Sequence, residues 1–154
     1  MNERNALPPP RADALDVARY LIEAYGPMAH RMLQKLLYYC QAGSLGWTGV
    51  PMFGNRIEAW ANGPVVVDLW NAHRYQPWID TVTGGQHALD PEARAIADSI
   101  WSAFGRFTAN DLSDMSHREA PWRDARGTLS PGARGNVEIS QEAMRDFYQR
   151  HWTN

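Results

Sequence analysis

The sequence predicts a single, mainly helical α+β domain, and three observations lead to that prediction. Apolar residues recur at helical spacing in several segments, each bounded by capping residues, glycine or proline. One stretch between two such segments alternates apolar and polar residues, which indicates a small sheet. A chain of 154 residues with 44% hydrophobic and 21% charged residues has the size and composition of one compact domain. We expect about six helices and a β-hairpin.

A proline-rich arm precedes the first predicted helix. Residues 1–12 contain three consecutive prolines, which disfavour a helix and predict a flexible, extended segment. The domain itself is expected to span residues 13–154. Its first helix follows Asp13, a favourable N-cap, and ends at Gly26, because glycine and the proline after it do not continue a helix.

The second predicted helix carries polar side chains of interest. It is expected over about residues 28–42, with Gly43 as its stop, and should pack against the first helix as an antiparallel hairpin. Spacings of three and four residues share a helix face, so its polar face carries Gln34, Lys35 and Tyr38. Lys35 is the only lysine among fifteen basic residues. Either this position needs a compact ammonium on a flexible stem, or the choice is chance.

A β-hairpin is predicted after the second helix. Residues 51–53 and 56–60 flank Gly54-Asn55, and a two-residue connection of this type between apolar runs favours a tight turn. Alternation along the second run places Glu58 and Trp60 on one face of the hairpin.

A third helix is expected to open at Gly63-Pro64 and to carry Trp70. Glycine permits a tight entry, and proline is favoured at the first position of a helix. Gly63 and Pro64 are therefore interpreted as architectural residues. Residues 75–89 are expected to form a surface loop because Gly84 and Gly85 lie in an irregular pattern.

Three more helices are predicted in the C-terminal half, and each starts at a residue suited to capping. These residues are Asp90, Thr108 and Ser140. The first of the three helices should end at Gly105 and the second near His117.

The segment between the last two capped helices is expected to be irregular. Pro121 should end the region that follows His117. Residues 127–136 hold four glycines or prolines and predict a loop, and residues 137–139 predict a short strand.

Composition and charge argue against several classes of protein. The net charge of −2 and the absence of a basic run argue against nucleic acid as a partner. No apolar run approaches the length of a spanning helix, and the N-terminus lacks the apolar segment of a signal peptide, so we expect a cytoplasmic protein with no membrane partner. The one cysteine, Cys40, is expected to be a buried hydrophobe, which fits a reducing compartment.

No motif in the sequence indicates catalysis. The five histidines lack the spacing of metal ligands, no glycine-rich phosphate loop is present, and no nucleophile elbow occurs. We therefore expect no catalytic residue, no cofactor and no metal site, and we interpret the chain as a binding protein rather than an enzyme. The alternative, an unrecognised hydrolase or transferase, requires a Lys–Glu–His cluster assembled from distant segments.

Three groups of residues together resemble a known family. They are residues 15–18 with 33–39, residues 51–66, and residues 112–122, which combine as LQKLLYY, IEAW, GPV, H and PW. In this order and spacing the chain is similar to the Panacea domain, also known from SocA-like and phage-associated GepA-like proteins. The resemblance covers about residues 13–126.

The resemblance implies an antitoxin of a bacterial, prophage-associated or phage-defence toxin–antitoxin system. Such a protein neutralises a cognate protein toxin by direct binding, in a 1:1 complex or in a 2:2 complex built on a homodimer. The alternative is a proteolytic adaptor that delivers the toxin to a AAA+ protease. A DNA-binding autorepressor is a further alternative, but the balanced charge weighs against it.

The shared motifs also imply which residues contact the partner. Two positions depart conservatively from the family pattern, Trp70 in place of tyrosine and Ser116 in place of threonine. The expected partner-binding residues are Gln34, Lys35, Tyr38, Glu58, Trp60, Trp70, His117 and Trp122, with Gly63, Pro64 and Pro121 in structural roles.

Two of these sets have alternative interpretations. We hypothesise that Lys35 and Glu58 pair across the junction of helix and sheet, the alternative being that solvent surrounds both. His117 with Trp122 forms either a latch onto the core or part of the interface, and we favour the latch.

Overall fold

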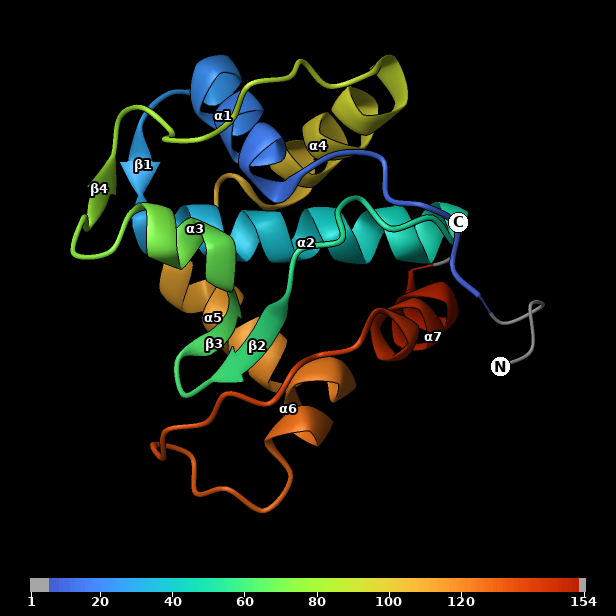
Figure 1. Ribbon diagram of the computed structural model, residues 1–154. Helices are drawn as coiled ribbons and strands as arrows, with labels where there is room; N and C mark the ends of the chain where they lie inside the picture. The colour runs from blue at the N-terminus through green and yellow to red at the C-terminus, as the bar shows by residue number, and fades with distance from the viewer. Residues whose placement is uncertain (1–5, 153–154) are drawn as a thin grey trace.

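The computed structural model describes residues 6–152 and confirms a mainly helical fold with a small sheet (Figure 1). The described residues form seven helices and two antiparallel strand pairs, β1 with β4 and β2 with β3. The helices are α1 (Ala14–Tyr25), α2 (His30–Thr48), α3 (Val67–Ala72), α4 (Pro91–Phe104), α5 (Ala109–His117), α6 (Ala120–Arg126) and α7 (Gln141–His151). The strands are β1 (Met28–Ala29), β2 (Ile57–Trp60), β3 (Gly63–Val66) and β4 (Trp78–Ile79).

Helix α2 forms the axis of the molecule. It contacts α1 and α4 on one side and α5, α7 and the β2–β3 hairpin on the other, as Figure 1 shows. Every residue from Met32 to Leu45 is buried, including the polar ones. The polar face predicted for this helix therefore does not face solvent. Periodicity marks polar positions, but it does not reveal that neighbouring elements cover and hydrogen-bond them.

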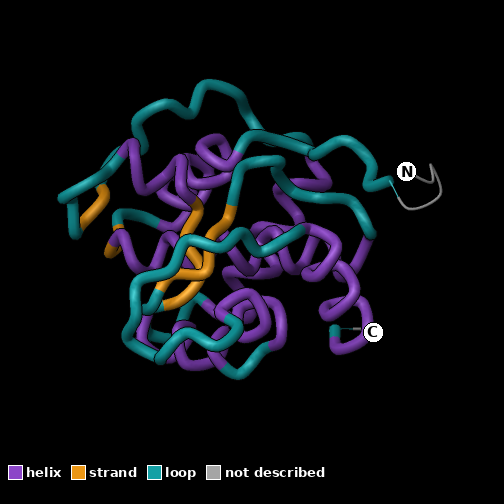
Figure 2. The backbone as a smooth tube through the Cα atoms, turned by 60° about the horizontal axis from the view of Figure 1, so that its bottom comes forward, coloured by secondary structure: helices purple, strands orange, loops and turns teal. Residues whose placement is uncertain are grey.

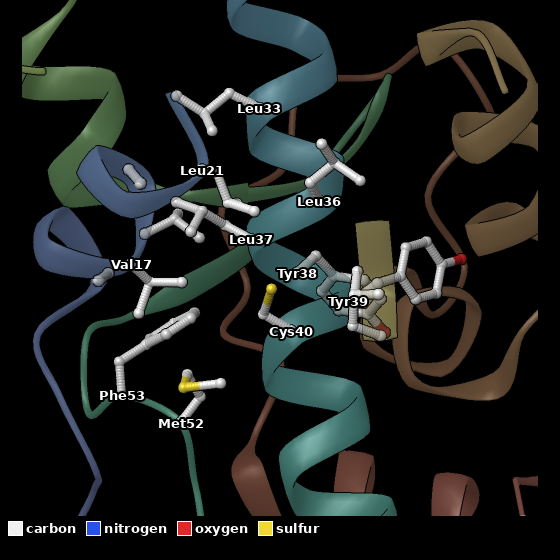
Figure 3. Packing of buried hydrophobic residues seen from close by; sticks show 14 of the residues in the cluster. Val17, Leu21, Leu33, Leu36, Leu37, Tyr38, Tyr39, Cys40, Met52 and Phe53 are labelled. Atoms are coloured by element: carbon white, nitrogen blue, oxygen red, sulfur yellow. The ribbon is translucent and has the colours of Figure 1, made fainter. Parts of the chain in front are cut away.

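The core lies on both sides of α2. Figure 3 shows Val17 and Leu21 of α1 with Phe53 gathered on the side of α2 that carries Leu37. Tyr39 points to the opposite side in the same view, where α4 and α7 supply Phe104 and Tyr148. Cys40 is fully buried within this cluster, as expected for a small hydrophobe.

The first helix ends at Gly26 as predicted, but the second continues six residues past its predicted stop. Gly43 lies inside α2, which ends at Gly49 in the left-handed conformation. At Gly43 a Cβ atom would stand 2.8 Å from the Trp47 ring and 3.1 Å from Ile100. Gly43 therefore lies in the middle of a packed helix instead of ending it.

Asn55 caps α1 in place of Asp13. The Asp13 side chain makes no cap hydrogen bond, and the amide of Ala14 donates to Asn55 Oδ1 over 2.9 Å. Because Asn55 and the preceding Gly54 are held at the start of α1, they do not form the predicted hairpin turn.

The hairpin turn lies further along the chain, at residues 61–62. Strand β2 pairs with β3 in the register Ile57 with Val66 and Trp60 with Gly63. Gly63 and Pro64 are therefore strand residues, and the prediction that they open a helix was wrong. Helix α3 begins only at Val67. Proline is suited to the first turn of a helix, but it also fits an edge position of a sheet.

The N-caps of three helices in the C-terminal half agree with the sequence prediction. Asp90, Thr108 and Ser140 each accept a hydrogen bond from a backbone amide in the first turn of their helix. Pro121, in contrast, lies in the first turn of α6 instead of ending the region. Residues 137–139 add a short antiparallel bridge to β2, through hydrogen bonds of Ala59 with Val137 and of Ile139 with Ile57.

Two loop segments pack against the domain. Of the predicted arm, residues 1–5 lie outside the described residues, whereas Arg11 and Ala12 donate to the carbonyls of Pro51 and Met52. Flexibility of the arm as a whole stays a prediction. In the predicted loop of residues 75–89, strand β4 pairs with β1.

Helix is the predominant secondary structure, and the strands are short (Figure 2). Within the described range, the helices are too short or too polar to cross a membrane.

Candidate partner-binding cleft

A cleft with a volume of about 980 Å³ opens between the N-terminal half of α2, the β2–β3 hairpin and α3. The loop that connects α6 to α7 borders it on one side. Five of the eight expected partner-binding residues line this cleft: Gln34, Lys35, Glu58, Trp60 and Trp70.

Gln34 joins helix α2 to strand β3 at the back of the cleft. Its amide oxygen accepts from the backbone N–H of Val66 over 2.7 Å, and its amide nitrogen donates to the Val66 carbonyl over 3.2 Å. The two bonds replace the ladder partner that β3 lacks on this side. Gln34 therefore fixes the distance between helix and hairpin, which sets the width of the cleft.

Lys35 lies at the floor of the cleft and is only 4% exposed. Its ammonium donates one long hydrogen bond, 3.5 Å, to the carbonyl of Pro64. At Gly63 a Cβ atom would stand 2.8 Å from Lys35 Cε and 2.9 Å from Nζ, so any other residue at position 63 would force the end of the Lys35 side chain to move. Burial, with a further contribution from the Arg31 charge, lowers the pKa of Lys35 to about 8.

Glu58 is paired with other residues, so the hypothesised Lys35–Glu58 pair does not form. The Glu58 carboxylate accepts from Arg56 Nε over 2.7 Å and from Trp60 Nε1 over 2.9 Å. Arg56 also bridges to Glu138 over 3.1 Å. The guanidinium outcompetes Lys35 because it lies two residues away on the same strand face. No carboxylate within residues 6–152 lies within 4.0 Å of the Lys35 ammonium.

Aromatic side chains form one wall of the cleft. The rings of Trp60 and Trp70 meet edge to face, with centroids 5.3 Å apart, and the His30 ring lies 5.7 Å from Trp70. Tyr75 stands at the rim and is 88% exposed. Burial lowers the pKa of His30, which favours its neutral form and an apolar character for this wall.

Cations predominate among the charged residues of the cleft. Arg31, Lys35 and Arg134 line it together with Glu58, whose charge Arg56 balances. Arg126 holds the loop that presents Arg134, because its guanidinium donates to the carbonyls of Ser130 and Ala133. A protein of net charge −2 thus carries a locally positive cleft.

Three expected partner-binding residues lie outside the cleft. Tyr38 is fully buried, with its hydroxyl 3.0 Å from that of Tyr148. His117 stacks on Trp122 with ring centroids 4.0 Å apart, and Trp122 Nε1 donates to the Trp60 carbonyl over 2.9 Å. This arrangement is that of the latch we favoured, since it ties α5 and α6 to the hairpin. Pro121 begins α6 directly before Trp122.

Sequence reasoning missed Arg31, His30, Arg134 and Tyr75 as cleft residues. Arg31 could have been predicted from the sequence, because it lies four residues before Lys35 and shares its helix face. Arg134 and Tyr75 lie in loops, whose sequence has no periodicity from which a face can be read.

The arrangement of side chains suits binding. Within residues 6–152 no three His, Cys, Asp or Glu side chains are placed to hold a metal ion. The Cys40 thiol is buried, and burial raises its pKa well above the ordinary value, which disfavours a reactive thiolate. The cleft instead offers an aromatic wall, the backbone-anchored amide of Gln34 and three cations.

The comparisons with known proteins agree with the resemblance. The family described as antitoxin SocA-like, Panacea domain, matches residues 33–123, which is more than half of the chain. No curated protein and no solved structure matches. The matched segment runs from α2 to α6 and includes the hairpin and the latch.

Proposed function

The chain belongs to the SocA-like antitoxin family, which carries the Panacea domain, and we propose that it neutralises a protein toxin by direct binding through the cleft between α2 and the β2–β3 hairpin. The toxin is encoded beside this chain, and both act in the cytoplasm. The chain contributes a surface, and it neither catalyses a reaction nor carries a cofactor.

One observation carries this proposal: residues of three separate elements within the family match converge on one cleft. Lys35 comes from α2, Glu58 and Trp60 from β2, and Trp70 from α3. Tryptophan, tyrosine and arginine side chains near the centre of an interface contribute most to protein–protein binding, and the cleft presents Trp60, Trp70 and Arg31.

Growth rescue tests the proposal. The neighbouring gene is expressed from an inducible promoter, alone and with this chain, and colony formation is counted. We expect the neighbouring protein alone to stop growth, coexpression to restore it, and the two proteins to copurify. A neighbour that is harmless, or that this chain neither binds nor silences, would refute the proposal.

The same cells distinguish direct neutralisation from a proteolytic adaptor. Toxin levels are followed after protein synthesis is blocked, with and without this chain, in cells with and without their AAA+ proteases. Direct neutralisation predicts a toxin that persists in the complex and a rescue that needs no protease. An adaptor predicts faster loss of the toxin and a rescue that fails when the protease is deleted.

A further inference from the structure

Lys35 is a buried cation that the described chain leaves without an anion. An ammonium has three donor protons, and among residues 6–152 the only hydrogen bond of Lys35 is the 3.5 Å contact with the Pro64 carbonyl. Burying a charge without a partner is costly, so buried charges in proteins are normally paired. The side chain nevertheless lines the cleft, where an incoming group can reach it.

The surroundings of Lys35 do not supply the missing anion. Its own helix presents Arg31, a like charge, and α5 presents Ser116 and His117, which carry no negative charge. Strand β3 presents Gly63 and the Pro64 carbonyl. The one carboxylate of the cleft, Glu58, is engaged by Arg56 and Trp60.

We propose that Lys35 anchors a carboxylate of the toxin, held in the cleft with apolar neighbours against Trp60 and Trp70. The assignment rests on the proposed function for the identity of the partner. The carboxylate belongs either to an acidic side chain or to the toxin's C-terminus, and both present the same group.

The cleft fits an acidic polypeptide segment better than an isolated phosphate. Its volume of about 980 Å³ accommodates several residues, and Val65, Pro77 and the indole rings form apolar contacts beside the cation. Arg31 and Arg134 lie among the lining residues and attract an acidic segment over a longer range. A charge-assisted bond at the buried floor fixes its register.

Because Lys35 is the only lysine of the chain, its binding can be observed without mutation. The full-length protein is labelled with lysine carrying ¹³C at Cε, which yields one lysine signal. Four probes are titrated: the blocked peptide acetyl-Gly-Leu-Glu-Leu-Gly-amide, the same peptide with Gln in place of Glu, the Gln peptide with a free C-terminal carboxylate, and sodium phosphate.

We expect the Glu peptide to bind about tenfold more tightly than the blocked Gln peptide and to raise the pH at which the Lys35 signal titrates. Arg31, His30 and His117, the other charged or titratable groups facing Lys35, are monitored through their side-chain signals in a second sample labelled at Arg and His, to assign the titration. Preferential binding of the free-acid Gln peptide supports the proposal with the toxin's C-terminus as the source. Equal binding of the Glu peptide and of both Gln peptides, or displacement of the Glu peptide by equimolar phosphate, overturns it.

Lys35→Met provides the second test, with Arg106→Met, an exposed residue just past the C-terminal end of α4, as its control. The proposal predicts that Lys35→Met abolishes the preference for the Glu peptide and that Arg106→Met retains it. Growth rescue distinguishes a failure of the carboxylate anchor from a failure of the antitoxin role. If Lys35→Met rescues as fully as the wild type, the carboxylate anchor is wrong and the antitoxin role stands, whereas a wild-type chain that fails to rescue refutes the antitoxin role.

Discussion

Lys35 is the residue at which stability and binding oppose each other. The folded chain buries its ammonium with one weak acceptor, which lowers the pKa to about 8. A group held in this way destabilises the free protein and becomes favourable only when a partner supplies a carboxylate. Such residues are typical of sites whose chemistry is completed by a ligand.

Lys35→Met is expected to raise the free energy of unfolding at pH 7. The gain is at most about 3 kcal/mol, because the pKa of Lys35 falls from about 10.4 in the unfolded chain to about 8 in the folded one. Between these two pKa values the unfolded chain binds the proton more strongly than the folded one. The free energy of unfolding of the wild type therefore rises as pH increases through this window, and the difference in stability between the variant and the wild type shrinks. Urea unfolding of both proteins at pH 7 and at about pH 9.5 measures the difference. A variant less stable than the wild type at pH 7, as a buried ion pair with Glu58 would predict, contradicts this account.

Gly63→Ala is expected to destabilise the protein more than Gly26→Ala. Both glycines have positive φ angles, +125° and +95°, so both alanines incur backbone strain of about 1–3 kcal/mol. Only at position 63 does the new methyl group also meet the Lys35 side chain, whereas nothing lies within 4 Å of it at position 26. Thermal unfolding of the two variants separates strain from the clash. Equal melting temperatures would show that β3 does not press on Lys35.

At the residue scale, the sequence identified much of the cleft but not the bonding within it. Residue type and spacing were enough to single out Lys35, Glu58 and Trp60. Arg56 pairs with Glu58 from two residues away on the same strand face, and spacing alone does not show which of two cations a carboxylate contacts. The pattern places Tyr38 on the polar face of the helix, and a tyrosine in such a position gives no sign that it is buried with its hydroxyl beside that of Tyr148.

At the element scale, α2 determines the architecture because it is covered on every side. Its glycines illustrate this. A Cβ atom at Gly46 would stand 2.8 Å from Tyr148 Cβ and 3.1 Å from the Tyr148 backbone, whereas one at Gly43 would meet mainly the ring of Trp47. Gly46 thus sets the distance between α2 and α7.

Gly46→Ala is therefore expected to destabilise the protein, although alanine is favoured over glycine in a helix by about 1 kcal/mol. The backbone of α7 cannot move locally, and overpacking costs about 1–3 kcal/mol. Gly43→Ala is the matched control in the same helix, because the Trp47 ring is partly exposed and can rotate away. Chemical unfolding should show a loss for position 46 and a small change for position 43. A gain at position 46 would contradict close packing of α7 on α2.

Helices were easier to predict than strands in this chain. The capped helices α4, α5 and α7 begin where their cap residues indicate, because a cap is a local interaction. The hairpin was misplaced because Gly54-Asn55 satisfies the local rule for a turn but serves a distant element, the start of α1. A tertiary contact of this kind has no local signature.

At the scale of the whole molecule, the family segment forms most of the cleft, and the remaining chain adds to its rim and supports it. Residues 33–123 supply most of α2, the hairpin, α3 and the latch. Helices α1 and α7 complete the core around α2, and the loop held by Arg126 adds Arg134 to the rim. The sequence pattern was enough to predict the fold class and the family, whereas the cleft depends on how the helices, the hairpin and the loops pack together in the folded chain.

Site-specific photo-crosslinking locates the toxin on this surface most directly. A benzoyl-phenylalanine replaces Tyr75 at the exposed rim of the cleft, and in a control protein it replaces Trp47 near the opposite end of α2, outside the cleft. Each protein is coexpressed with the neighbouring toxin and irradiated, and crosslinked pairs are detected by mass. The account predicts a crosslink to the toxin from position 75 and none from position 47. A crosslink from position 47 with none from position 75 would contradict it.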